Sequence, residues 1–235
     1  MKNILITRQP SDAIEFINIL SYKKFHPFLL PMIHTISVNT EVKKSFYDYI
    51  IFTSKNSVNY FKNHFSQITF KDIIAIGPGT LNTLEKMGYT TQFIPKDYSA
   101  DGIIALLSDL ELINKKCLLP GPKKREPKIE NFLETKGASV DIMVIYETKM
   151  TNYDKNYIYN FLEEYSIEVI TFFSPSAVDS FFTQFETDLD NFYVISMGKT
   201  TYNHLKSKGI KSFFPKKATV RSIIELLNCL SHNNE

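Results

Sequence analysis

The sequence predicts an α/β fold with two doubly wound, parallel-sheet domains joined by a two-stranded linker. Three observations predict it: an internal repeat, short apolar runs that alternate with amphipathic segments, and two longer extended segments at similar places in the two halves. The chain has 235 residues, of which 43% are hydrophobic and 22% charged. This length and composition suit one large or two small globular domains and exclude a disordered or fibrous chain.

Corresponding residues recur at a nearly constant spacing along the chain. Phe52 and Phe172 are 120 positions apart, and Gly77 and Gly198 are 121 positions apart. The same spacings relate further pairs: Ser54/Ser174, Val58/Val178, Thr80/Thr201, Leu84/Leu205, Gly88/Gly209, Pro95/Pro215 and Ile103/Ile223. Because a spacing that slips by one residue over about fifty positions is too regular for chance, the chain is interpreted as a duplicated unit.

Short apolar runs are predicted as strands of parallel sheets. They are four to six residues long and rich in Ile, Phe and Val, which is typical of strands covered on both faces. The predicted strands are residues 3–7, 49–53, 73–77, 117–120, 169–173 and 192–197.

Helices are predicted between these strands. In residues 81–87 and 103–112, apolar residues recur at spacings of three and four. Gly88, Gly137 and Gly209 follow such patterns and are predicted as left-handed C-terminal caps. Lys123, Lys124 and Arg125 are expected to open a further helix. Alternating strands and helices indicate right-handed βαβ crossovers and a flavodoxin-like arrangement.

Two extended segments, residues 28–38 and 140–150, are longer than a typical core strand. We interpret them as strands that leave one domain and continue into the other. On this interpretation residues 1–36 and 150–235 form one discontinuous domain, and residues 37–149 form an inserted domain. The repeat alone leaves a tandem arrangement, split near residue 114, as an alternative.

Several classes of protein and site are disfavoured. No run approaches 18 apolar residues, so no membrane span is expected, and the first apolar run turns polar at Thr7, too early for a signal peptide. Only two cysteines, Cys117 and Cys229, suggest the reducing cytoplasm. The net charge is +2 without a long basic block, so nucleic acid is not an expected partner. No complete dinucleotide, phosphate-loop, serine-hydrolase or zinc motif is present, which disfavours metal, nucleotide and covalent serine catalysis.

Serine, threonine or glycine residues recur where predicted strands lead into helices. They are Thr53, Ser54, Gly77, Thr80 and Ser99 in one half, and Ser174, Ser176, Gly198, Thr200, Thr201 and Thr219 in the other. One interpretation is plain helix capping. The other is ligand binding, because the carboxyl ends of parallel strands share one edge, and free amides there favour anions. Two such edges facing each other would form a cleft for a ligand with many carboxylates.

Two further side chains are candidates for this cleft. Arg8 directly follows the first predicted strand and is the strongest basic candidate, although a surface charge is more often only solvated. Tyr146 lies in the predicted linker, on the hinge side of the cleft. With thirteen tyrosines in the chain, simple packing is the alternative for this residue.

An ordered set of motifs gives the chain a family resemblance. The motifs are ILITR, IIFTSKNSV, IAIGPGT, IPKDYSADGIIALL, VIYET, ITFFSPSAV and MGKTT. Together, over essentially the whole chain, they resemble uroporphyrinogen-III synthases. The resemblance implies two α/β domains with a two-stranded linker, and no cofactor or metal. The segment LLPGPKKRE departs from the family pattern, since it lacks the usual Arg-Gly after its strand.

The resemblance also implies an activity. Such an enzyme cyclises the linear tetrapyrrole hydroxymethylbilane, with loss of water and inversion of the last ring through a spiro intermediate, in haem biosynthesis. Tyr146 matches the family's cleft tyrosine, which would assist departure of the hydroxyl. Thr80 and Thr200 match threonines that face the cleft, and Ser174 with Ser176 match a helix start. A monomer is expected, with handover of substrate from hydroxymethylbilane synthase.

Two other functions remain open at this point. Two α/β lobes with a hinge also describe proteins that bind or sense an anionic ligand without catalysis. The chain could also be a domain that works fused to another tetrapyrrole enzyme or a regulator, because a fold does not fix a function.

Overall fold

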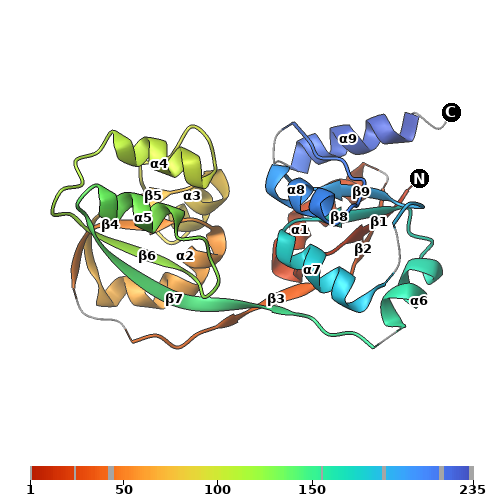
Figure 1. Ribbon diagram of the computed structural model, residues 1–235, viewed down its shortest axis with the longest axis horizontal. Coiled ribbons are helices and arrows are strands. Elements are labelled where there is room, and N and C mark those ends of the chain that lie inside the picture. The colour runs from red at the N-terminus through yellow and green to blue at the C-terminus, as the bar shows by residue number, and fades with distance from the viewer. Residues whose placement is uncertain are drawn as a thin grey trace. The chain divides into compact units, whose positions relative to one another are not determined.

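The computed structural model describes residues 2–23, 25–41, 45–154, 156–186, 189–216 and 220–232. The chain forms two compact units: unit 1 contains Met1–His34 and Lys149–Glu235, and unit 2 contains Thr35–Thr148. Each unit has a predominantly parallel sheet with helices packed on both faces, as Figure 1 shows. The predicted α/β class is therefore confirmed.

Unit 1 is built on a four-stranded parallel sheet in the order β2-β1-β8-β9. Its strands are β1 (Asn3–Ile6), β2 (His26–Leu29), β8 (Val169–Phe172) and β9 (Tyr193–Ser196). One face packs against α6 (Tyr157–Glu164), α7 (Pro175–Gln184) and α8 (Lys199–Ser207). The other face packs against α1 (Pro10–Tyr22) and α9 (Val220–His232). Burial on both faces explains why these strands read as short, continuous apolar runs.

Unit 2 contains a five-stranded sheet in the order β3-β7-β6-β4-β5. Its strands are β3 (Ile33–Ser37), β4 (Phe46–Phe52), β5 (Thr69–Ala75), β6 (Lys116–Pro122) and β7 (Ser139–Met150). On one face lie α2 (Lys55–Phe61), α3 (Pro78–Glu85) and the 3₁₀ helix η1 (Lys62–Gln67). On the other lie α4 (Ala100–Ser108) and α5 (Lys128–Thr135).

The sequence repeat corresponds to equivalent places in the two sheets. Strands β4 and β8 carry one pair of repeated segments, and β5 and β9 carry the next. Aligning the orders β2-β1-β8-β9 and β7-β6-β4-β5 puts each pair at the same place and makes β6 the counterpart of β1. Numbered in chain order, the strands of unit 1 run 2-1-3-4, which is the flavodoxin-like order, and the aligned strands of unit 2 run 4-3-1-2, because β4 and β5 precede β6 and β7 in the sequence. The order reverses between β1 and β8 in unit 1 and between β4 and β6 in unit 2.

The chain passes between the units through β3 and β7. The Val38 amide donates to the Ile145 carbonyl at 3.0 Å, and the Thr151 amide donates to the Met32 carbonyl at 2.9 Å. Residue numbers rise along one segment and fall along the other, so the two segments run antiparallel.

The first of the two predicted extended segments is not continuous. Residues 28–38, expected as one segment, contain the end of β2 and all of β3, separated by residues 30–32. The chain leaves the edge of one sheet and enters another there, and Pro31 has no amide hydrogen to continue a ladder. The second segment, residues 140–150, lies within the single strand β7.

The predicted helix ends are confirmed, but one predicted helix start is wrong. Gly88, Gly137 and Gly209 have φ values of +84°, +81° and +79°, as left-handed caps require. Residues 123–125 do not open a helix, because α5 begins only at Lys128. Pro127 precedes that helix, and a proline disfavours helical backbone at the residue before it.

The close approach of backbone at Gly102 gives a first prediction. A Cβ added to this glycine, in the first turn of α4, would lie 1.8 Å from the Asp97 carbonyl oxygen. Gly102→Ala is therefore expected to lower the free energy of unfolding by about 2 kcal/mol or more, measured by urea denaturation. Gly79→Ala, in the first turn of α3, is the matched control, since no atom lies within 4 Å of its added Cβ. Equal stabilities of the two variants would contradict the packing described.

A second prediction concerns the two thiols. Cys117 is buried on β6, and desolvation, with a smaller contribution from Asp48, raises the pKa of its thiol to about 12. Cys229 is exposed on α9. Since the thiolate is the reactive form, iodoacetamide at pH 8 should add one label to the native protein, at Cys229, and two after denaturation. Peptide mass spectrometry that finds Cys117 labelled at a comparable rate in the native protein would refute this.

Candidate functional site

The predicted strand-to-helix junctions are helix N-caps in both units. Ser54, Ser99 and Ser174 precede α2, α4 and α7, and each side-chain oxygen accepts a hydrogen bond from a backbone amide three residues later. The N···O distances are 3.1, 3.1 and 3.3 Å. Gly77 and Gly198 are the N-caps of α3 and α8 and contribute no side chain. Backbone amides in the first turns of α3 and α8 therefore have no side-chain cap from these residues.

In unit 2 the structure brings two of the predicted site residues together. Ser54 Oγ lies 3.5 Å from Tyr146 Oη and 3.0 Å from Ser57 Oγ. Ser54 follows the carboxyl end of β4, and Tyr146 pairs with Pro122 at the carboxyl end of β6. The three hydroxyls thus form a connected row at the edge of the sheet where parallel strands end.

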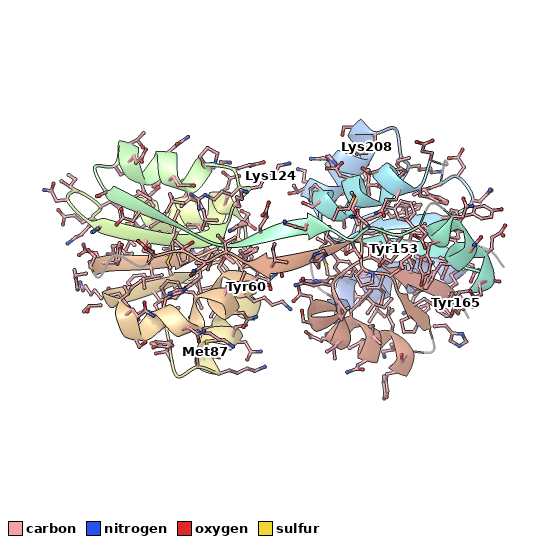
Figure 2. All side chains as sticks on the ribbon, turned by 90° about the horizontal axis from the view of Figure 1, so that it is seen from below. Tyr60, Met87, Lys124, Tyr153, Tyr165 and Lys208 are labelled. Atoms are coloured by element: carbon pink, nitrogen blue, oxygen red, sulfur yellow. The ribbon has the colours of Figure 1, made fainter. Side chains whose placement is uncertain are left out.

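Tyr146 is held in place from two sides. The residue is 6% exposed, and its ring stacks on the Tyr60 ring, with centroids 5.1 Å apart and an interplanar angle of 19°. Tyr60, labelled in Figure 2 on α2, donates from Oη to the Thr35 carbonyl at 3.0 Å. On the backbone side, the Lys123 amide donates to the Tyr146 carbonyl at 2.9 Å. The tyrosine is fixed in orientation by packing and hydrogen bonding before any ligand arrives.

Sequence reasoning missed Tyr60. It is one of thirteen tyrosines, and its spacing from Tyr146 carries no periodic signal. Tyr60 lies one helical turn after the buried Ser57 on α2, but its partner Tyr146 on β7 depends on the sheet order.

In unit 1 the corresponding edge carries a threonine pair and an arginine. Thr7 Oγ1 donates to the Thr171 carbonyl at 2.8 Å, and Thr171 Oγ1 donates to the Leu5 carbonyl at 2.7 Å, which ties β1 to β8. The Arg8 guanidinium carbon lies 5.1 Å from the Phe173 ring centroid. Arg8 Nε is 3.6 Å from the Asp12 carboxylate. Arg8 therefore sits where the strand order of unit 1 reverses, as expected for a ligand-facing position in such folds.

The remaining predicted residues line the same edges with different exposures. Thr80 and Thr201 are buried near the starts of α3 and α8, whereas Ser176 and Thr200 are exposed in the first turns of α7 and α8. Thr53 is half-buried beside Ser54. Thr219 lies outside the described residues.

The site chemistry is that of neutral donors with few charges. Hydroxyls and the first amides of α3, α7 and α8 can donate to carboxylates without a strong acid or base. Within the ranges given above, no group of three or more His, Cys, Asp or Glu side chains could hold a metal ion. No helix in that part of the chain is both long and apolar enough to cross a membrane.

Comparison with known proteins gives one consistent answer. Residues 15–225 match the family described as uroporphyrinogen-III synthase HemD. The uroporphyrinogen-III synthase of Chlorobaculum parvum is 26% identical over 97% of this chain and 100% of its own length.

Two solved structures share the fold. The uroporphyrinogen-III synthetase of Helicobacter pylori superposes with a TM-score of 0.67 at 21% identity, covering 98% of this chain and 100% of the other. A mutant uroporphyrinogen III synthase from Thermus thermophilus gives a TM-score of 0.64 at 14% identity, covering 99% and 100%. With a family match that covers most of its length and a fold shared with solved members, this chain belongs to the uroporphyrinogen-III synthase family.

Proposed function

We propose that this chain converts hydroxymethylbilane to uroporphyrinogen III, with loss of water and inversion of the last pyrrole ring. The observation that carries the proposal is the placement of Tyr146 Oη beside Ser54 Oγ, at the carboxyl edge of the unit 2 sheet, in a chain with this family match. Family membership favours an enzyme over the alternative of a module that only binds or senses an anion.

The reaction needs orientation more than strong acid–base groups. The hydroxyl of the substrate leaves readily because the pyrrole nitrogen supplies electrons, and the resulting azafulvene closes spontaneously without inversion. The protein must therefore hold the chain so that the substituted carbon of the last ring attacks. Tyr146 donates a hydrogen bond to the departing hydroxyl, and Ser54 orients the phenol.

The acetate and propionate arms require many donors, and the two sheet edges offer them. We assign substrate contacts in each unit to Arg8, Thr53, Ser54, Gly77, Ser99, Ser174, Ser176, Gly198 and Thr200, and a supporting role to Thr80 and Thr201. Glycines at the caps of α3 and α8 favour close approach of a carboxylate to backbone amides. Thr80 and Thr201 are buried under these turns. Their side chains fix the conformation of the backbone that contacts the substrate.

The proposal extends to the organisation of the protein. We take residues 1–36 and 150–235 as one domain and residues 37–149 as the other, which agrees with the compact units within two residues. The enzyme acts as a monomer in the cytoplasm without a cofactor. It receives hydroxymethylbilane from hydroxymethylbilane synthase, since a substrate that closes spontaneously favours rapid transfer.

The direct test is product identity. Hydroxymethylbilane is generated in place by its synthase, this protein is added, and the oxidised products are separated by isomer. We expect isomer III to predominate, and isomer I alone would show that closure was spontaneous and that the protein merely binds or does nothing.

The role of Tyr146 gives a quantitative prediction. Tyr146→Phe keeps the ring stacked on Tyr60 and removes only the hydroxyl. Loss of one donor to a leaving group should lower kcat by about tenfold or more without abolishing turnover, and should leave KM within about threefold.

Tyr89→Phe is the matched control, because Tyr89 stacks on Phe65 with centroids 4.0 Å apart and was not assigned to the site. Its kinetics should equal those of the unaltered protein. Unchanged kinetics in Tyr146→Phe would remove this tyrosine from the mechanism.

A further inference from the structure

A pocket of about 200 Å³ opens at the carboxyl ends of the central strands of unit 2. Its walls include Ile51 on β4, Leu119 on β6 and Ile129 on α5, and Thr53 and Arg125 lie among its polar lining residues. The pocket lies where β4 and β6 are neighbours and the strand order reverses, which is where open α/β sheets bind ligands.

Arg125 is fixed in this pocket by a buried carboxylate. Its Nε lies 2.6 Å from Glu130 Oε1, and the two side chains are only 22% and 10% exposed. A guanidinium has five N–H donors in a planar fork, so a partner at Nε leaves donors on the Nη groups for a second acceptor. Arg125 Nη1 lies beside the backbone of β6, since a Cβ added at Gly121 would be 3.9 Å from it, an ordinary contact distance.

The duplication provides an independent argument. Arg125 follows β6, and Arg8 follows β1, the counterpart of β6 in the other sheet. Each arginine is paired through Nε with a carboxylate at the start of the next helix, Glu130 on α5 and Asp12 on α1. Each unit therefore has an arginine at the equivalent place in its fold, and in each unit a carboxylate holds the guanidinium group.

We propose that the Arg125 pocket binds one carboxylate arm of the linear tetrapyrrole, with Glu130 as the residue that positions the guanidinium. This inference rests on the proposed function. A water molecule takes about 30 Å³ of liquid volume, so the pocket has room for an acetate or propionate arm. The apolar walls pack against the methylenes of the arm, and the guanidinium binds its carboxylate.

The test is steady-state kinetics of isomer III formation with four proteins. Removing Arg125 alone would leave Glu130 buried without its partner, so the main variant is Arg125→Gln with Glu130→Gln, which removes both charges. Arg125→Lys keeps the positive charge but lacks the planar guanidinium group with its several N–H donors. Lys124→Gln is the matched control, since Lys124 is exposed one residue away and is labelled in Figure 2.

We expect the double variant to raise KM about tenfold or more, with kcat within about threefold and an unchanged melting temperature. Arg125→Lys should be intermediate, and Lys124→Gln should match the unaltered protein. A folded double variant with a KM within about twofold of the control would overturn the subsite. Should the double variant unfold, Arg125→Lys with an unaltered KM would overturn it instead.

These outcomes are separate from the failure of the proposed function. If the unaltered protein forms no isomer III, the proposed activity is wrong, and the proposed subsite is wrong as well. If the unaltered protein forms isomer III and the variants match the control, only the subsite is wrong.

Discussion

The polarity of the parallel sheets is the constraint on which the site depends. Parallel strands bring every carboxyl end, and hence every following helix start, to the same edge of a sheet. In unit 2 this places the N-cap Ser54, the hydroxyl of Tyr146 and the Arg125 pocket at one edge, although they come from segments far apart in sequence. In unit 1 the same polarity places Arg8 beside Phe173 and near the start of α7.

Helix capping and ligand binding are complementary uses of these junctions. The serine caps satisfy some of the first amides of their helices, which stabilises each helix by about 1 kcal/mol. The glycine caps of α3 and α8 contribute no side-chain acceptor, so their first turns are the more open to an anionic group. A substrate with many carboxylates can then be oriented with few formal charges, which suits a reaction in which conformation decides the product.

The sequence predicted the elements better than the contacts between them. The repeat and the apolar runs identified the sheets, because burial on both faces leaves a clear pattern. The interruption between β2 and β3 was not predicted, because the residues on both sides of Pro31 have the same extended pattern in the sequence and differ only in the sheet to which they belong. Tyr60 and the Arg125–Glu130 pair were missed because stacking and ion pairing across elements follow from sheet order, which no local spacing encodes.

The central claim is the proposal that amides and side chains at the helix starts of each unit bind carboxylates of the tetrapyrrole. Two-dimensional amide NMR during addition of reduced uroporphyrinogen III tests it most directly. The account predicts that resonances from the first turns of α3, α7 and α8, together with Tyr146, shift along the same saturation curve. Shifts confined to one unit, or to residues away from these strand ends, would contradict it.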